Sequence, residues 1–216
     1  MTRGQQQAMD RLLPVFGLNI ADFADGPRDI QNTLGGADSV VVEIGFGDGE
    51  ALVQMARENP QSGFVGIEVH PPGVGHLLLR LGELEIDNVR VFTEDAVDVI
   101  RSCIADETVD KFCLFFPDPW PKKKHNKRRI LNAEFAELLT RKLKPGGRFH
   151  FATDWEEYAW QALECLGNMN GLVNTAGSGQ FSPRPEDRPL TKFERRGQRL
   201  GHSVFDIVMQ KSSHRI

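Results

Sequence analysis

One short segment limits the possible folds of this chain more than any other. Residues 39–44 are an apolar run rich in β-branched side chains, which predicts a buried strand. Three alternate glycines in residues 45–49 predict a tight turn, because glycine adopts backbone conformations that other residues avoid. Apolar residues then recur at helical spacing over 50–58 until Asn59-Pro60. A strand, a turn and a helix in this order predict the first unit of a parallel sheet.

The same alternation continues through most of the chain. Strands are predicted at 64–69, 89–92, 111–116, 148–152 and 203–209, and helices at 74–84, after Asp95, at 133–143 and at 155–166. This pattern predicts an α/β fold with a mostly parallel sheet covered by helices on both faces. The last strand follows the Gly/Ser/Pro-rich loop 177–189 and a segment, 191–200, that holds one or two helical turns. Too few residues then remain for a crossover helix before the last strand. Because a parallel strand needs such a crossover, an antiparallel last strand is favoured.

Residues 1–38 are predicted to form an N-terminal arm or extension ahead of a domain at 39–216. Only residues 5–13 have a weak helical pattern, which ends at Pro14, and residues 17–36 are polar and rich in turn formers. No apolar run could span a bilayer and no signal-peptide pattern is present, so we expect a cytoplasmic protein without membrane association. The three cysteines have no metal-ligand spacing, and no metal site is expected.

Charge is divided unevenly along the chain. The net charge is −4, but the residues up to Pro119 include 8 basic and 20 acidic side chains, and the rest include 18 basic and 10 acidic ones. A basic surface attracts phosphate and an acidic surface attracts cations, so the two parts are expected to have different partners. Two differently solvated surfaces would give the same division.

Acidic residues stand at three consecutive predicted strand ends: Glu43, Glu68 and the pair Glu94-Asp95. In an open parallel sheet, ligands bind beyond the carboxyl ends of the strands. Carboxylates there can accept hydrogen bonds from ribose hydroxyls and an adenine amine and can attract a cationic group, and S-adenosylmethionine carries all three. Glu50 occupies the place where a dinucleotide fingerprint needs its last Gly or Ala, which disfavours a nicotinamide dehydrogenase. The alternative interpretation is that these glycines and carboxylates are ordinary turn residues with no ligand.

A second group of residues follows the strand at 111–116. Pro117-Asp118-Pro119-Trp120-Pro121 is predicted to hold its acid and its aromatic ring stiffly in the cleft. The carboxylate can accept hydrogen bonds from a nucleobase edge, and the ring can stack on a base. Residues 122–129 then contain six Lys or Arg residues, which can neutralise RNA phosphates. A solvated face or a localisation peptide would explain the basic run alone.

These motifs resemble known families. The pattern hydrophobic-Glu-x-Gly-x-Gly-x-Gly at 42–49, with an acidic end to the second strand, resembles the class I methyltransferases. Residues 115–129 closely resemble the signature of the bacterial-type tRNA (guanine-N7)-methyltransferases, and segments 66–75, 152–155, 191–194, 196–197 and 201–202 agree with it. Asn126 departs from the family, in which a second histidine is frequent. The resemblance implies a Rossmann-like class I fold with a seven-stranded sheet.

The resemblance also implies an activity and its residues. The activity is methyl transfer from S-adenosyl-L-methionine, which leaves S-adenosyl-L-homocysteine, to N7 of a guanosine in tRNA. The implied target is the variable-loop guanosine, position forty-six in tRNA convention. Asp118 is implied as both the catalytic residue and a cofactor contact. The other expected cofactor contacts are Glu43, Gly45, Gly47, Gly49, Glu68, Asp95 and Ala96. The implied substrate contacts are Lys122, Asp154, Thr191, Lys192, Phe193 and Glu194, and the implied RNA contacts are Lys124, His125, Asn126, Lys127, Arg128 and Arg129.

Several alternatives stay open at this stage. Asp154 could cap the helix that follows its strand, and residues 191–194 could be an ordinary exposed helix start. The chain could methylate another RNA or a small molecule, or could bind RNA without catalysis. No obligate protein partner is implied, and both a monomer and a homodimer are compatible with the sequence.

Overall fold

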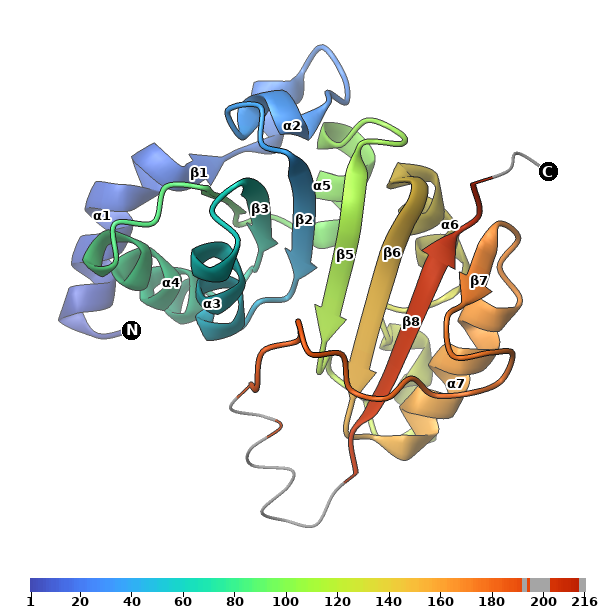
Figure 1. Cartoon of the computed structure of the whole chain (residues 1–216). Helices are drawn as coiled ribbons and strands as arrows, with labels where there is room; N and C mark the ends of the chain where they lie inside the picture. The colour runs from blue at the N-terminus through green and yellow to red at the C-terminus, as the bar shows by residue number, and fades with distance from the viewer. Residues whose placement is uncertain (192–193, 195–202, 214–216) are drawn as a thin grey trace.

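The computed structural model describes residues 1–191, 194 and 203–213. Within them, eight strands form one sheet in the order β1-β4-β3-β2-β5-β6-β8-β7, with helices on both faces (Figure 1). The strands are β1 (Gly17–Leu18), β2 (Ser39–Ile44), β3 (Ser62–Ile67), β4 (Val89–Phe92), β5 (Val109–Phe115), β6 (Leu143–Thr153), β7 (Leu172–Asn174) and β8 (Phe205–Lys211). The helices are α1 (Arg3–Phe16), α2 (Ile30–Thr33), α3 (Glu50–Glu58), α4 (Pro71–Glu83), α5 (Ala96–Cys103), α6 (Ala133–Lys142) and α7 (Glu156–Gly167), with 3₁₀ helices η1 (Ile20–Phe23) and η2 (Lys123–Arg128).

The strand directions confirm the predicted fold class. β8 pairs antiparallel with β6 and β7, and the other strand pairs are parallel. The described sheet has eight strands rather than seven because the two-residue β1 pairs with the edge strand β4. β1 and the three-residue β7 are too short to give a periodic signal in the sequence.

The register of the central strands aligns their carboxyl ends. Ile44 at the end of β2 pairs with Ile67 of β3 on one side and with Leu114 of β5 on the other, and Ile67 pairs with Phe92 of β4. The turns that follow β2, β3, β4 and β5 therefore start at one level, at the edge of the sheet where the acidic residues were expected. Figure 1 shows the described part of the loop between β7 and β8, drawn in orange, crossing this same edge.

An apolar cluster covers each face of the sheet. On one face, α5, α6 and α7 pack on strand residues that include Val42, Phe112 and Phe149. On the other, α1, α3 and α4 pack on strand residues that include Phe64 and Val91. No helix among the described residues is both long and apolar enough to cross a bilayer.

Two of the predicted helices differ from the prediction by more than one residue at an end. α1 continues through Pro14 to Phe16, because Pro14 is exposed and the helix packs tightly on α4: a Cβ on Gly82 would lie 2.9 Å from Leu12 Cδ1. This packing outweighs the hydrogen bond that proline cannot make. α4 begins at Pro71, three residues before the predicted start, because proline is favoured in a first helical turn.

Candidate active site

The glycine turn after β2 has the conformation that its sequence predicts. Gly45, Gly47 and Gly49 have φ values of +69°, +62° and +78°, in the left-handed region. The Gly47 N–H donates to Glu68 Oε2 at 2.9 Å, which joins the turn to the end of β3. A Cβ on Gly49 would lie 2.8 Å from Leu77 Cβ, so this glycine is also needed for the packing of α4.

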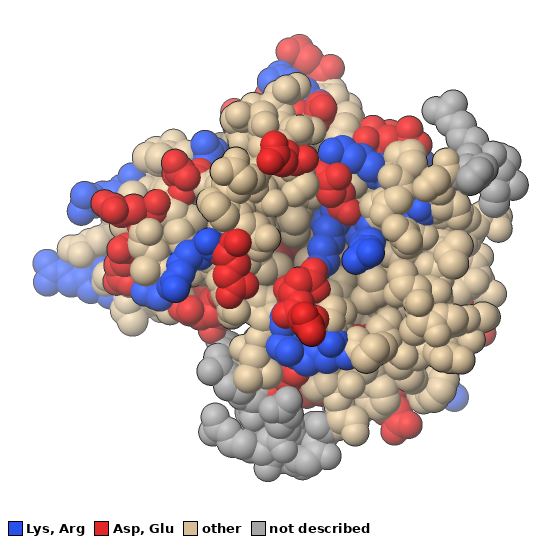
Figure 2. Space-filling view, viewed as in Figure 1, with Lys and Arg blue, Asp and Glu red and all other residues tan. Residues whose placement is uncertain are grey.

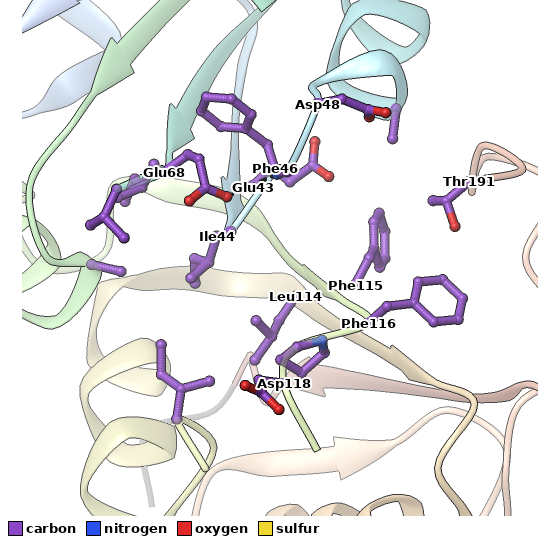
Figure 3. Close-up of a pocket in the computed structure, with 18 of the residues that line it drawn as sticks. Glu43, Ile44, Phe46, Asp48, Glu68, Leu114, Phe115, Phe116, Asp118 and Thr191 are labelled. Carbon is purple, nitrogen blue, oxygen red and sulfur yellow. Dashed lines mark hydrogen bonds between the residues drawn. The ribbon is translucent and has the colours of Figure 1, made fainter. Parts of the chain in front are cut away.

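A cavity of about 550 Å³ opens at the carboxyl ends of β2 to β5, within the usual range for small-ligand sites (Figure 3). Its lining includes eight of the predicted site residues: Glu43, Gly45, Gly47, Glu68, Asp95, Ala96, Asp118 and Thr191. Gly49 is not among the lining residues, and its described role is to pack against α4. The other lining residues include Ile44, Phe46, Asp48, Ile67, Val69, Glu94, Leu114, Phe115, Phe116 and Ile130.

The carboxylates make one end of this cavity strongly acidic. Glu43 is 3% exposed, and its Oε2 has no hydrogen-bond partner among the described residues. Burial, with the nearby Asp48 and Glu68 carboxylates, raises the pKa of Glu43 to about 8. A buried oxygen without a partner, in a cavity with several acids, would be stabilised by a ligand that brings a positive charge or hydrogen-bond donors.

Two acids with different local roles, Glu94 and Asp95, follow strand β4. Asp95 accepts a hydrogen bond from the Val97 N–H at 2.8 Å and caps α5. Glu94 Oε1 accepts from the Ile20 N–H at 2.8 Å, and its Oε2 has no partner in the described structure. Glu94 also lines the cavity, although it is not among the expected cofactor contacts.

Asp118 lies at the mouth of the cavity in a constrained loop. Phe116 and Trp120, on either side of it, have φ values of +49° and +45°, which are unusual for residues other than glycine. Asp118 is exposed, and its Oδ1 accepts from the Trp120 N–H at 3.1 Å. Trp120 does not line the cavity, so its predicted place in the cleft is wrong: the ring packs against His125 and Arg128.

The predicted RNA contacts separate into exposed and buried side chains. Lys124, Lys127 and Arg128 are exposed, as is Lys122 at the start of η2. In the part of the chain that the structure describes, no carboxylate lies within ion-pair distance of Lys122, Lys123, Lys124, Lys127 or Arg128. His125 and Asn126 are half-buried.

Arg129 is a correction to the predicted RNA surface. This residue is 2% exposed, and its guanidinium lies against Pro119 and α7 rather than in solvent. Acceptors of the protein surround this cation, so little of the guanidinium is exposed for a direct phosphate contact.

The predicted substrate contacts lie in different surroundings. Thr191 lines the cavity, whereas the carboxylate of Glu194 is 1% exposed and ion-paired with Arg188 and Arg184. Asp154 is half-buried at the end of β6 and is not the cap of α7, whose N-cap residue is Trp155. Lys192 and Phe193, and most of the predicted segment 191–200, lie outside the described residues.

The uneven charge along the chain is not a division of the molecular surface into two halves. On the face shown in Figure 2, Lys and Arg side chains lie beside Asp and Glu side chains over α3, α4 and the middle of the sheet. Arg80 of α4, for example, pairs with Glu50 at 3.1 Å and with Glu83 at 2.7 Å. Charges of one sign are instead concentrated locally, with acidic residues in the cavity and basic residues in η2.

The sequence of this chain is similar to those of known methyltransferases. A family model described as "Putative methyltransferase" matches residues 37–207. A tRNA (guanine-N(7)-)-methyltransferase of Saccharophagus degradans is 50% identical over 212 residues, 98% of this chain and 91% of the relative. Proteins of the same name from Pseudomonas putida and Shewanella oneidensis are each 49% identical over 211 residues, 98% of this chain and 87% of the relative.

Solved structures of low identity share the fold. The 16S rRNA methyltransferase KamB has a TM-score of 0.58 at 17% identity and covers 84% of this chain and 92% of its own. A SAM dependent methyltransferase from Aquifex aeolicus has a TM-score of 0.55 at 15% identity, with 97% and 100% covered. The near-complete match at half identity and the match of the family model agree with the site geometry: this chain belongs to the tRNA (guanine-N7)-methyltransferase family.

Proposed function

We propose that this protein transfers the methyl group of S-adenosylmethionine to N7 of a guanosine in tRNA, which gives 7-methylguanosine and S-adenosylhomocysteine. The observation that carries the proposal is the position of Asp118, on the rim of an acidic cavity and a few residues before the exposed cations of η2. The family membership selects this reaction among those that the geometry permits. By resemblance, the target is the variable-loop guanosine at position forty-six.

The residues of the cavity fit S-adenosylmethionine. When bound, this cofactor supplies a methyl group made electrophilic by a sulfonium. Glu43 has an unpartnered buried oxygen that can face a cationic group, and Glu68 and Asp95 stand at the next two strand ends, where ribose and base groups need acceptors. Apolar residues such as Ile67, Val69 and Ile130 complete the lining, as a flat adenine ring requires.

Asp118 is proposed as the catalytic residue through orientation and electrostatics. Guanine N7 has a lone pair and no proton, so its attack on a methyl group needs no general base. The Asp118 carboxylate would accept hydrogen bonds from guanine N1–H and the exocyclic amine, which orients N7 and stabilises the positive charge that forms on the purine. Adenine has no N1–H to donate, so with adenine in place of guanine the carboxylate would lose this partner, at a cost of about 1–3 kcal/mol once the bound base excludes water from it.

The tRNA would contact the exposed cations of η2 through its phosphates. Lys124, Lys127 and Arg128 have no acidic partner among the described residues, so their charge is available to an anion. Lys122, Asp154 and Thr191 remain proposed substrate contacts, of which Thr191 lines the cavity. We expect the enzyme to act in the cytoplasm, as a monomer or a homodimer.

The proposed function is tested by methyl transfer to RNA. The purified protein is incubated with methyl-labelled S-adenosylmethionine and bulk tRNA from cells that lack this modification, and the digested nucleosides are separated. Label in 7-methylguanosine is the expected result. Label in another nucleoside would identify a different RNA methyltransferase, and tRNA binding without label would indicate a non-catalytic RNA-binding protein. Either result would overturn the proposal.

A further inference from the structure

The buried side chain of Arg129 joins the loop that contains Pro119 to helix α7. Its Nε donates to the carbonyl oxygen of Pro119 at 2.8 Å. Its two terminal nitrogens donate to the side chains of Gln161 and Glu157 on α7, the latter at 3.2 Å. Its guanidinium carbon lies 4.8 Å from the centre of the Tyr158 ring, also on α7. Stacking and three hydrogen bonds from a planar group hold this side chain in one orientation.

Pro119 follows Asp118 directly, in a loop with few other hydrogen bonds. Prolines at 117, 119 and 121 have no N–H to donate. The loop is tied at its start by the Phe116 N–H, which donates to the Ala152 carbonyl at 2.7 Å, and internally by Trp120 N–H and Asp118 Oδ1. Two non-glycine residues with positive φ persist only where the surroundings hold them, and Arg129 holds the carbonyl between them.

The same contacts connect this loop to the proposed RNA surface. The Asn126 side chain of η2 donates to Glu157 Oε1 at 2.8 Å, the same oxygen that accepts from Arg129. The Arg129 N–H also donates to the Asn126 carbonyl at 3.0 Å. A shift of η2 would therefore move the partners of Arg129, and through Pro119 it would move Asp118.

We propose that Arg129 is a positioning residue for methyl transfer: its guanidinium, fixed on α7, holds the Pro119 carbonyl and so orients the Asp118 carboxylate at the cavity. This inference rests on the proposed function, because it gives Asp118 the catalytic role. It differs from the RNA-contact role that the resemblance implied for Arg129. A misplacement of about 1 Å at a reacting group can cost about 100-fold in rate, so one hydrogen bond to the loop has a large kinetic effect.

The test compares neighbouring arginines with opposite surroundings. Arg129→Gln removes the buried guanidinium, Arg129→Lys keeps a charge without the planar fork, and Arg128→Gln removes an exposed cation. Arg141→Gln, at an exposed position of α6, is the control for charge alone. For each variant, kcat, KM for tRNA, the Kd of S-adenosylmethionine and the salt dependence of tRNA binding are measured.

For Arg129→Gln we expect kcat to fall by about 10- to 100-fold, with the slope of log affinity against log salt unchanged. Arg129→Lys should recover part of kcat. Arg128→Gln should flatten the salt slope. An Arg129→Gln enzyme with wild-type kcat, or with a flatter salt slope at unchanged kcat, would overturn the inference.

A double-mutant cycle separates positioning from a general loss of structure. If Arg129 acts through Asp118, Arg129→Gln should lower kcat far less in an Asp118→Asn background than in the wild type. Additive effects would overturn the inference, as would an Arg129→Lys variant that binds the cofactor normally and keeps full kcat. A wild-type enzyme that forms no 7-methylguanosine would contradict the proposed function instead, so the two failures are distinguishable.

Discussion

The guanidinium of Arg188 and the carboxylate of Glu194 form an ion pair in which the two side chains are 0% and 1% exposed. Arg188 Nη2 also donates to Asp206 on β8, at 3.1 Å. Arg188 thus joins the segment before β8 to the strand itself, close to Thr191 on the cavity wall. Glu194, which the resemblance implied as a substrate contact, has a structural partner in this arrangement.

Replacing Arg188 is expected to destabilise the protein much more than replacing Arg184. Arg188→Met removes the buried cation between two buried carboxylates, which leaves Glu194 with Arg184 and Asp206 with His150 as partners. Breaking a buried pair in this way costs about 3–5 kcal/mol of unfolding free energy. Arg184 also pairs with Glu194, at 3.3 Å, but its side chain is 41% exposed, so Arg184→Met should cost about 1 kcal/mol or less. Urea denaturation of both variants measures the difference. Equal and small losses would show that the buried pair contributes little.

Much of the fold could be predicted because the central strands are buried and bounded by glycine or proline. The runs that became β2, β3 and β5 needed only local pattern to be recognised, and their parallel pairing follows from the helices between them. The strands β1 and β7 could not be predicted from the sequence. Such short segments are strands because they pair with a neighbouring strand, and their composition gives no signal. α1 was predicted too short because its contact with α4 outweighs the local effect of Pro14.

The cavity could be predicted at the strand ends but not in its apolar wall. Glu43 and Glu68 stand out because a charge at the end of a buried strand is unusual, whereas Phe115 and Ile130 have the same sequence pattern as core residues. The burial of Arg129 could not be predicted from the sequence either. Arg128 and Arg129 are adjacent and identical, and only the position of α7 decides which of the two side chains is buried.

Alanine at the glycines of the turn is expected to cost different amounts of stability. Gly45→Ala introduces a side chain at φ +69° with no atom within 4 Å of its Cβ, so only backbone strain of about 1–2 kcal/mol is added. Gly49→Ala adds a clash with Leu77 at 2.8 Å to similar strain, and overpacking of this kind costs about 1–3 kcal/mol more. Denaturation midpoints rank the two variants. A Gly45→Ala protein that is less stable than Gly49→Ala would contradict the packing role of Gly49.

The stability of the ligand-free protein is expected to fall as pH rises from about 5 to 8, in part because of Glu43. The pKa of this group is raised to about 8 in the folded state, so the unfolded chain binds fewer protons in that range and ionisation favours unfolding. One such group contributes about 1.4 kcal/mol per pH unit. Glu43→Gln should make this slope smaller by up to about 1.4 kcal/mol per pH unit, while Gln at the exposed Glu186 should leave it unchanged. Parallel slopes for Glu43→Gln and the wild type, measured by urea denaturation at pH 5 and 8, would show that Glu43 ionises normally.

Asp118→Asn is expected to lower turnover sharply without a comparable loss of cofactor affinity. The amide keeps the size of the side chain but loses the charge that would stabilise a positive purine, and loss of such a group costs about 100-fold or more in kcat. Single-turnover methylation of tRNA gives the rate, and calorimetric titration with S-adenosylhomocysteine gives the affinity. Near-wild-type turnover would remove Asp118 from the mechanism.

Neutralising the exposed cations of η2 is expected to flatten the salt dependence of tRNA binding. Each lost phosphate contact should reduce the slope of log affinity against log salt by about 0.7–0.9. The variant carries Gln at Lys122, Lys123, Lys124, Lys127 and Arg128 and keeps the buried Arg129. The control carries Gln at Arg141 and Lys144, cations that already pair with Glu137 and Asp110, and should keep the wild-type slope. The affinity of both variants for tRNA is measured over a range of salt concentrations. An unchanged slope in the first variant would place the phosphate contacts on another surface.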